Sequence, residues 1–173
     1  SPKEVDAMTS IAVRLEPFSI IAQALVGWGR LGVGAAAAAI APLRHVLELE
    51  PRFSVGRWLL GQALVSSGAT DEGLAELRRA VEQSNQLGWM VAKLGCALAH
   101  AGKVEEARGV LAELTRRAET EYVPSFQFAS MHAYLGNEAS ACAWLERAIE
   151  DGDPGLAFLR IDGIDHPFAI ITD

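Results

Sequence analysis

Cys96 and His100 are the pair of side chains whose types and spacing most directly suggest chemistry. Residues four apart on a helix share one face, as two ligands of a metal ion or a thiolate and its base must. The sequence places no third ligand and no orienting acid nearby, and His45, His132 and His166 have no metal-ligand spacing to one another. We therefore interpret all four histidines as structural and predict neither a metal site nor a catalytic cysteine.

A second candidate is the run from Gly27 to Gly32, which has the glycine spacing of a dinucleotide-binding turn. That fingerprint needs a preceding parallel strand and a strand-helix-strand unit. Gly27 instead belongs to an evenly spaced series with Gly61 and Gly95. Because a glycine repeated at a constant step indicates close approach of helix backbones, we predict helix packing here and no cofactor.

Acidic side chains cluster without forming a catalytic set. Asp162, Asp165 and His166 surround a glycine and suggest either a cation site or a turn; the remaining spacing of a calcium loop is missing, so we expect a turn. Glu105 and Glu106 adjoin a predicted helix end, where paired carboxylates are usually solvated. Because no nucleophile, base and orienting group occur together, we predict that the chain is not an enzyme.

Composition and charge limit the kinds of partner that the chain is expected to bind. The 173 residues are 50% hydrophobic but only 7% aromatic, which suits closely stacked helices built from Ala, Leu, Val and Gly. The formal net charge of -7 repels nucleic acid and anionic membrane surfaces, so direct binding to either is not expected.

Two further features bear on the compartment. Cys96 and Cys142 lie in different predicted helices and match no disulfide framework, which fits a reducing, cytoplasmic environment. Residues 18–43 are apolar, but Gln23 and Arg30 interrupt them. We therefore predict a soluble chain without a transmembrane segment.

The dominant pattern is a repeat with a period of 34, visible in four columns. Their members are Gly27, Gly61, Gly95 and Ala129; Ala39, Gly73, Ala107 and Ala141; Leu43, Leu77, Leu111 and Leu145; and Val46, Ala80, Leu114 and Ala148. This period is typical of repeats made of two antiparallel helices, in which small residues allow close backbone approach and leucines fill the space between helices. We therefore predict an all-α fold.

The columns and the turn residues between them place the helices. First helices are predicted near residues 18–31, 54–66, 87–101 and 123–135, and second helices near residues 35–49, 70–84, 104–119 and 137–150. Pro42 falls inside one second helix and is expected to kink or shorten it. Residues 18–154 are thus predicted to form four repeats. Residues 155–173 form a degenerate end of the same continuous domain, with a short helical piece at 156–161 and an irregular tail at 162–173.

Residues 1–17 are predicted to be the second helix of an incomplete repeat. Ala12 lies one period before Val46, and Pro17 lies one period before Pro51. Half a repeat leaves an apolar flank uncovered, whereas a solenoid normally ends in a capping element. We therefore expect a fragment of a longer polypeptide; the alternative is that this lone helix is itself the cap. The uncovered flank also leaves association into a homodimer open.

In arrays of this kind the first helices line a concave groove, so their inward positions predict where a partner binds. The positions at equivalent inward offsets are Trp28, Trp58, Gln62, Trp89, Lys93, Cys96, His100, Phe126, Gln127, Ser130 and Tyr134. Aromatic side chains on such a surface offer large contact area at small entropic cost. They predict a partly apolar cleft for a protein segment; the alternative for each ring is packing between neighbouring helices.

The Leu-Gly pairs at residues 60–61 and 94–95, together with the period, resemble the tetratricopeptide family over about nine tenths of the chain. The signature is degenerate, because the family's early Trp column holds Gln23, Arg57, Val91 and Ser125 here. The resemblance implies a right-handed α-α superhelix that binds partners. The family's co-chaperone branch clamps C-terminal carboxylates with Asn, Lys and Arg; since only Lys93 has a comparable place here, binding of chaperone tails is not expected.

Residues 122–125, 133–136, 143–148 and 156–162 read Tyr-Val-Pro-Ser, Ala-Tyr-Leu-Gly, Ala-Trp-Leu-Glu-Arg-Ala and Leu-Ala-Phe-Leu-Arg-Ile-Asp. This stretch looks like the C-terminal repeat region of multidomain bacterial regulators. In those relatives similar arrays follow a winged-helix DNA-binding domain, a nucleotide cyclase domain or a serine/threonine kinase domain. The resemblance implies a sensory or protein-interaction part attached to such an effector domain, although Gly163 replaces the proline that is usual after the final Asp.

Taken together, the residues and the resemblance predict a non-catalytic protein-interaction and regulatory module of a larger bacterial signalling or transcriptional regulator. Its groove would bind a partner segment or a neighbouring domain. The predicted contact residues are Trp28, Trp58, Gln62, Trp89, Lys93, His100, Phe126, Gln127 and Tyr134. The rival hypothesis is a small-ligand sensor whose aromatic groove encloses a metabolite and whose change in curvature is passed to an effector domain.

Overall fold

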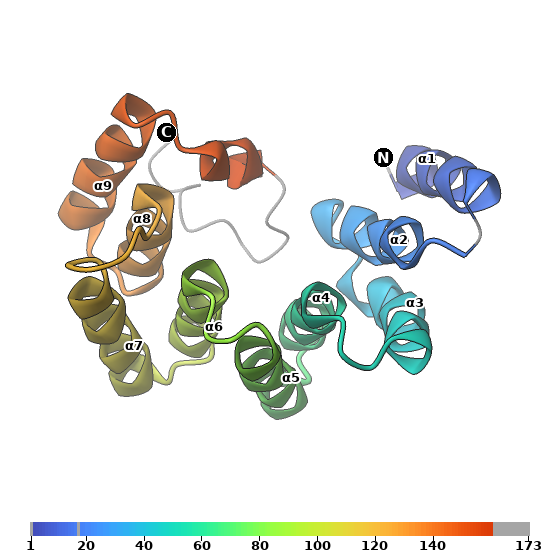
Figure 1. Cartoon of the computed structure of the whole chain (residues 1–173), viewed down its shortest axis with the longest axis horizontal. Coiled ribbons are helices and arrows are strands. Elements are labelled where there is room, and N and C mark those ends of the chain that lie inside the picture. Colours follow the sequence, from blue (N-terminus) through green and yellow to red (C-terminus); the bar gives the residue numbers. More distant parts are fainter. Residues whose placement is uncertain (1, 17, 161–173) are drawn as a thin grey trace. The chain divides into compact units, whose positions relative to one another are not determined.

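The structure, a computed structural model, describes residues 2–16 and 18–160, and over these ranges the chain is all-α (Figure 1). The described part has nine α-helices, one 3-10 helix and no strand. The elements are α1 (Pro2–Leu15), α2 (Ile20–Gly32), α3 (Ala36–Leu49), α4 (Ser54–Ser66), α5 (Thr70–Gln83), α6 (Gly88–His100), α7 (Val104–Arg117), α8 (Ser125–Tyr134), α9 (Glu138–Glu150) and the 3-10 helix η1 (Pro154–Arg160). The prediction of an all-α fold is confirmed.

Helix boundaries follow the predicted ranges closely. α4 begins and ends where the sequence predicts, whereas α8 begins at Ser125 instead of residue 123. The later start has a local cause, because Val123 precedes Pro124 and the residue before a proline is disfavoured in helical conformation. The short piece predicted at 156–161 is the 3-10 helix η1. The predicted tail and its Asp162, Asp165 and His166 cluster lie outside the described residues.

A glycine with positive φ ends the first helix of each hairpin. Gly34, Gly68, Gly102 and Gly136 follow one another at the period of the repeat and have φ between 72° and 92°. The residue after each glycine donates its backbone N–H to the carbonyl five residues back, as in the 2.9 Å bond from Ala69 to Leu64. This is the Schellman arrangement, which favours glycine because a side chain is strained at positive φ. The ends of the first helices therefore recur at the same period as the core residues.

Contacts divide the chain into two compact units at Ser84 and Asn85. Unit 1 contains α1 to α5, and unit 2 contains α6 to α9 and η1. Within each unit consecutive α-helices pack against one another, and one first helix packs against the next: α2 against α4, and α6 against α8. The same packing scheme thus recurs in both units. The prediction of one continuous domain stays a prediction.

The repeat columns form the cores of the units. In unit 1, Leu43 and Val46 are fully buried, and Leu77 is nearly so. A Cβ atom at Gly61 would lie 2.7 Å from Leu77 Cγ, and one at Gly27 would collide with Leu43 in the same way. In unit 2 the buried column residues are Gly95, Ala107, Leu114, Ala129, Ala141 and Ala148, while Leu111 and Leu145 are half-buried. Glycine in the first column is therefore a packing requirement in unit 1, which supports the interpretation of Gly27 given above.

Pro42 lies inside α3, yet the helix runs its full length from Ala36 to Leu49. Of the two effects expected of Pro42, the shortening of this helix is not found, and the kink stays a prediction. A proline at position 42 removes the N–H that would bond to Ala38 O in a regular helix. Arg30 of α2 takes over that role, because its Nη1 donates to Ala38 O at 2.8 Å. The side chain from the neighbouring helix thus satisfies the carbonyl that the proline leaves unpaired within its own helix.

We expect substitutions of Arg30 and Pro42 to have coupled effects on the free energy of unfolding. Arg30→Ala should lower the free energy of unfolding by about 1 kcal/mol, because Ala38 O loses its donor. Pro42→Ala should raise it by about 1 kcal/mol or more, since the N–H of the new alanine can bond to Ala38 O. In the Pro42→Ala background the effect of Arg30→Ala should therefore shrink. Urea denaturation of the four proteins of this double-mutant cycle measures the coupling, and strictly additive effects would show that Arg30 does not serve Ala38 O.

Candidate partner-binding surfaces

The predicted groove residues divide between the two units. Trp28 of α2 and Trp58 and Gln62 of α4 belong to unit 1. Unit 2 holds the others, on two adjacent first helices: Trp89, Lys93, Cys96 and His100 on α6, and Phe126, Gln127, Ser130 and Tyr134 on α8. We call the surface formed by the less buried residues of this group, Trp89, Lys93, His100 and Tyr134, the first-helix face of unit 2.

The structure brings members of the first-helix face together across α6 and α8. Lys93 Nζ lies over the ring of Phe126, 5.9 Å from its centroid. The rings of His100 and Tyr134 meet edge to face with centroids 6.3 Å apart. His100 is exposed, and Trp89, Lys93 and Tyr134 are half-buried. These partly exposed side chains make a mixed aromatic and cationic surface, which suits a segment carrying apolar and acidic groups.

Other predicted contact residues are core residues instead. Phe126 is only 1% exposed and packs with Ala129 and Ala141 in the core of unit 2. Its ring packs against the first turn of η1, since a Cβ at Gly155 would lie 2.7 Å from Phe126 Cδ1. Trp58 is also buried, at 9% exposure. For these two rings the alternative of packing between helices holds, so neither offers an open contact surface.

Polar members of the predicted set are buried as well. Gln62, Gln127 and Ser130 are each less than one tenth exposed. Among the described residues, Gln127 Oε1 finds no hydrogen-bond partner. Cys96 is buried in α6, and Cys142 is half-buried in α9. No group of three or more His, Cys, Asp or Glu side chains able to hold a metal ion occurs within residues 2–16 and 18–160.

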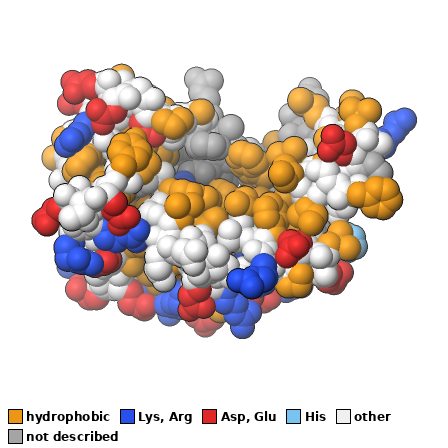
Figure 2. All heavy atoms as spheres, viewed as in Figure 1, with side chains coloured by type: hydrophobic (Ala, Val, Ile, Leu, Met, Phe, Trp, Pro, Cys, Tyr) orange, Lys and Arg blue, Asp and Glu red, His pale blue; other side chains and the backbone are white. Residues whose placement is uncertain are grey.

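Unit 1 contains a cavity that the sequence does not predict. It measures about 460 Å³, and its lining includes Met8, Thr9 and Ala12 of α1 and Leu25, Trp28 and Gly29 of α2. We call it the N-terminal cavity. Figure 2 shows hydrophobic side chains gathered over α1 and α2 at this end of the chain. Trp28, predicted as a groove residue, lies in this cavity.

The repeat itself contains the signal that could have revealed the N-terminal cavity. Leu25 and Gly29 stand one period before Leu59 and Ala63 of α4. Leu59 is 2% exposed and Ala63 is fully buried in α4, which packs against α2 and α3. Leu25 is 37% exposed. Comparing equivalent positions therefore identifies a face that is covered on α4 and open on α2.

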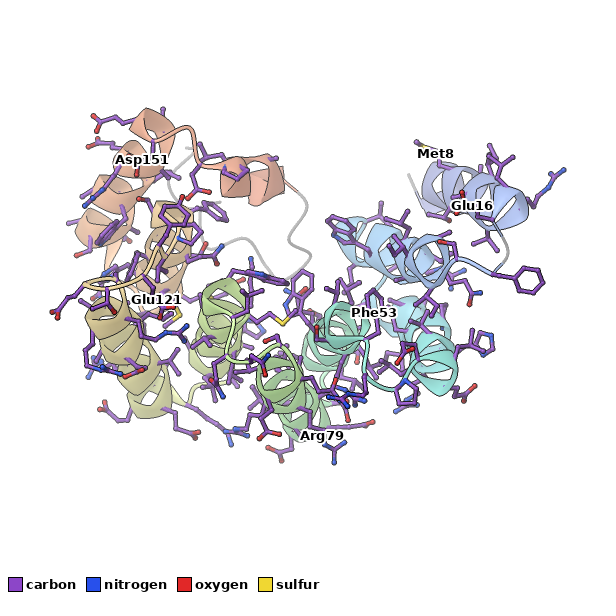
Figure 3. The ribbon with its side chains drawn as sticks, viewed as in Figure 1. Met8, Glu16, Phe53, Arg79, Glu121 and Asp151 are labelled. Carbon is purple, nitrogen blue, oxygen red and sulfur yellow. The ribbon has the colours of Figure 1, made fainter. Side chains whose placement is uncertain are left out.

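Two aspartates position the start of α8 in unit 2. Asp153 is 4% exposed, and its carboxylate accepts hydrogen bonds from Phe126 N at 2.9 Å and from Gly155 N at 2.8 Å. The Ser125 hydroxyl donates to Asp151 Oδ2 at 2.8 Å, and Asp151 is labelled in Figure 3. Backbone N–H groups at a helix start need such acceptors. The two carboxylates thus tie the end of α9 and the start of η1 to the start of α8.

The acidity of His132, on α8, is shifted by its surroundings. Burial lowers the pKa of its imidazole below the usual 6.5, because desolvation penalises the charged form. Among the described residues its Nδ1 atom is buried without a hydrogen-bond partner. Since the unfolded chain binds this proton more readily than the folded chain, the folded state loses stability as the pH falls through the unfolded pKa.

We therefore expect the wild-type chain to lose stability relative to His132→Gln between pH 7.5 and 5.5. Urea midpoints of the two proteins at several pH values in this window measure the difference. Glu113 and Glu121 do not interfere, because hydrogen bonds from Arg116 and Arg117 respectively lower their pKa values below the usual range. Parallel pH profiles of the two proteins would contradict the role assigned to His132.

No protein-family model matches the chain, and a search of curated proteins gives no match. Within the described ranges, none of the helices is both long and apolar enough to cross a lipid bilayer.

Proposed function

We propose that this chain is a tetratricopeptide-like array, a right-handed superhelix of helical hairpins, that binds a segment of another protein or a neighbouring domain. On this proposal it is a non-catalytic regulatory part of a larger cytoplasmic bacterial signalling or transcriptional regulator. The observation that carries the proposal is the recurrence of one packing scheme at the period of the repeat. Glycines with positive φ at Gly34, Gly68, Gly102 and Gly136 end the first helices, and α2 on α4 and α6 on α8 repeat one contact.

The first-helix face of unit 2 is the proposed binding surface. It presents Lys93 beside half-buried and exposed rings, namely Trp89, His100 and Tyr134. An apolar segment with a carboxylate near Lys93 would combine aromatic contact with charge attraction. Phe126 supports the face from below as a core residue, with the Lys93 ammonium over its ring. Substitution of Phe126 would therefore disturb folding, and tests of binding should use the more exposed positions.

A library of random dodecapeptides displayed on phage, selected against the immobilised full chain, tests the proposal. We expect enriched sequences that combine apolar residues with Asp or Glu. Lys93→Glu should raise the dissociation constant of such a peptide at least about tenfold, because attraction becomes repulsion. Arg108→Glu is the matched control, since Arg108 is exposed on the second helix α7. Failure to enrich any sequence, or equal binding by Lys93→Glu and the wild-type chain, would refute the proposal.

A further inference from the structure

The connection between α5 and α6 contains two exposed residues in the left-handed region of backbone conformation. Asn85 has φ 55° and Gln86 has φ 61°, and among the described residues no other non-glycine residue has a positive φ. This conformation is costly for a residue with a side chain and is usually adopted by single residues. Such outliers persist only where the surrounding structure holds them, and they cluster at segments that change conformation.

The repeat provides a reference for this connection. Residues 50–53 join α3 to α4 and lie one period before residues 84–87. None of the four earlier residues has a positive φ, and Glu50 is extended, with φ −136° and ψ 87°. Its equivalent Ser84 instead has φ −86° and ψ 6°. Two connections of equal length and equivalent position therefore have different backbone conformations.

A side chain of α7 holds the left-handed conformation. Arg117 Nη2 donates to the carbonyl of Gln86 at 2.8 Å, and Arg117 Nε donates to the carboxylate of Glu121, which is labelled in Figure 3. The Arg117 side chain is only 16% exposed. One period earlier, Gln83 donates to Pro51 O at 3.3 Å. The final residue of the second helix thus binds the connection before its own hairpin in both cases, but the carbonyl it holds lies one residue further along in the second.

The residue types at this connection are compatible with both conformations. Pro17 and Pro51 stand two periods and one period before Asn85. The proline ring locks φ near −65°, so a left-handed conformation is impossible at Pro51. Asparagine adopts negative φ as readily as other residues and tolerates positive φ better than most. Replacement of the proline by Asn85 therefore permits the left-handed conformation without excluding the conformation of the earlier connection.

We propose that residues 84–87 are a hinge with two states. In the observed state Asn85 and Gln86 are left-handed, and Arg117 holds the carbonyl of Gln86. In the second state the connection has the conformation of residues 50–53, and Arg117 no longer holds that carbonyl. Hinges use a few loop residues in this way to absorb a change in φ and ψ. The switch changes the direction in which the chain enters α6, and it does not rest on the proposed peptide binding by unit 2.

NMR of the ¹⁵N-labelled full chain tests the hinge. Asn85→Pro enforces the negative φ of Pro51, so its amide signals at residues 88–90 should be those of the second state. Arg117→Gln supplies the side chain found one period earlier and should raise the population of the second state at least about tenfold, because a hydrogen bond from a charged donor is lost. The signals of residues 88–90 should then move toward their Asn85→Pro positions or appear there as a second set. Arg108→Gln, at an exposed position of α7, should leave them in place.

Gln86→Gly distinguishes a hinge from a bond that merely stabilises the fold. Glycine adopts positive φ without strain, so the observed state should keep its population even when Arg117 is replaced. In the Gln86→Gly background Arg117→Gln should therefore move the signals about fivefold less than in the wild-type background. Three results would overturn the proposal. They are an Asn85→Pro chain that is unfolded by far-UV circular dichroism, signals of Arg117→Gln that do not move toward the Asn85→Pro positions, and equal movements in the two backgrounds.

Discussion

Replacing Gly73 with alanine is expected to lower the free energy of unfolding by about 3 kcal/mol, a large effect for one methyl group. Gly73 lies at the contact between α4 and α5, where a Cβ would be 2.7 Å from Gly61 O and 2.8 Å from Val65 N. Both atoms are backbone, so no side chain can rotate away to make room. The two helices would have to separate, which would also loosen the packing of Leu77 against Gly61.

Gly109→Ala is the matched control for this prediction. Gly109 also lies inside a helix, α7, but nothing lies within 4 Å of the position of its Cβ. There alanine should stabilise the chain by about 0.5 to 1 kcal/mol, because glycine is a poor helix former. Urea denaturation followed by circular dichroism measures both variants. Similar effects of the two substitutions would show that Gly73 is not a point of close backbone approach.

The second large effect is expected for Glu76→Gln in unit 1. The side chains of Glu76 and Arg57 are only 12% and 13% exposed, and Arg57 Nη1 donates to Glu76 Oε2 at 2.5 Å. Arg79, labelled in Figure 3, donates to the other carboxylate oxygen at 2.6 Å. Glutamine removes the negative charge and leaves the Arg57 guanidinium largely buried without its anion. We expect a loss of about 3 kcal/mol in the free energy of unfolding.

Glu105→Gln provides the comparison on an exposed pair. Glu105 and Arg108 are bonded at 3.0 Å, but both side chains are more than half exposed. Exposed pairs contribute little to stability, so this variant should unfold almost like the wild-type chain. Replacing Arg57 and Glu76 together by Met and Leu should recover much of the loss from Glu76→Gln, because no buried charge remains. A Glu76→Gln variant as stable as Glu105→Gln would refute the importance of the buried pair.

The sequence predicts the helices and their order because the relevant forces are local and periodic. The column from Gly27 to Ala129 marks close backbone approach, and the turn glycines mark helix ends. The repeat does not predict interactions that depend on one particular side chain. The bond from Arg30 to Ala38 O, and the pair formed by Arg57 and Glu76, join residues whose separations of 8 and 19 do not follow the period.

The candidate binding surface was predictable only in part for a related reason. His100, Tyr134 and Phe126 all occupy positions on the first helices that were predicted to face the groove. His100 is exposed, whereas Phe126 is covered by the start of η1 at Gly155, a contact made from beyond the last hairpin and not by the repeat. An offset on a helix indicates the side that faces a neighbour. It does not show which further segment covers that side.

The most direct test of the proposed function is to locate a selected peptide on the ¹⁵N-labelled full chain by NMR titration. We expect amide shifts to concentrate in α6 and α8, around Lys93, His100 and Tyr134, and we expect Lys93→Glu to abolish them. Shifts confined to the second helices α7 and α9, or to α1 and α2 around the N-terminal cavity, would contradict binding at the first-helix face of unit 2.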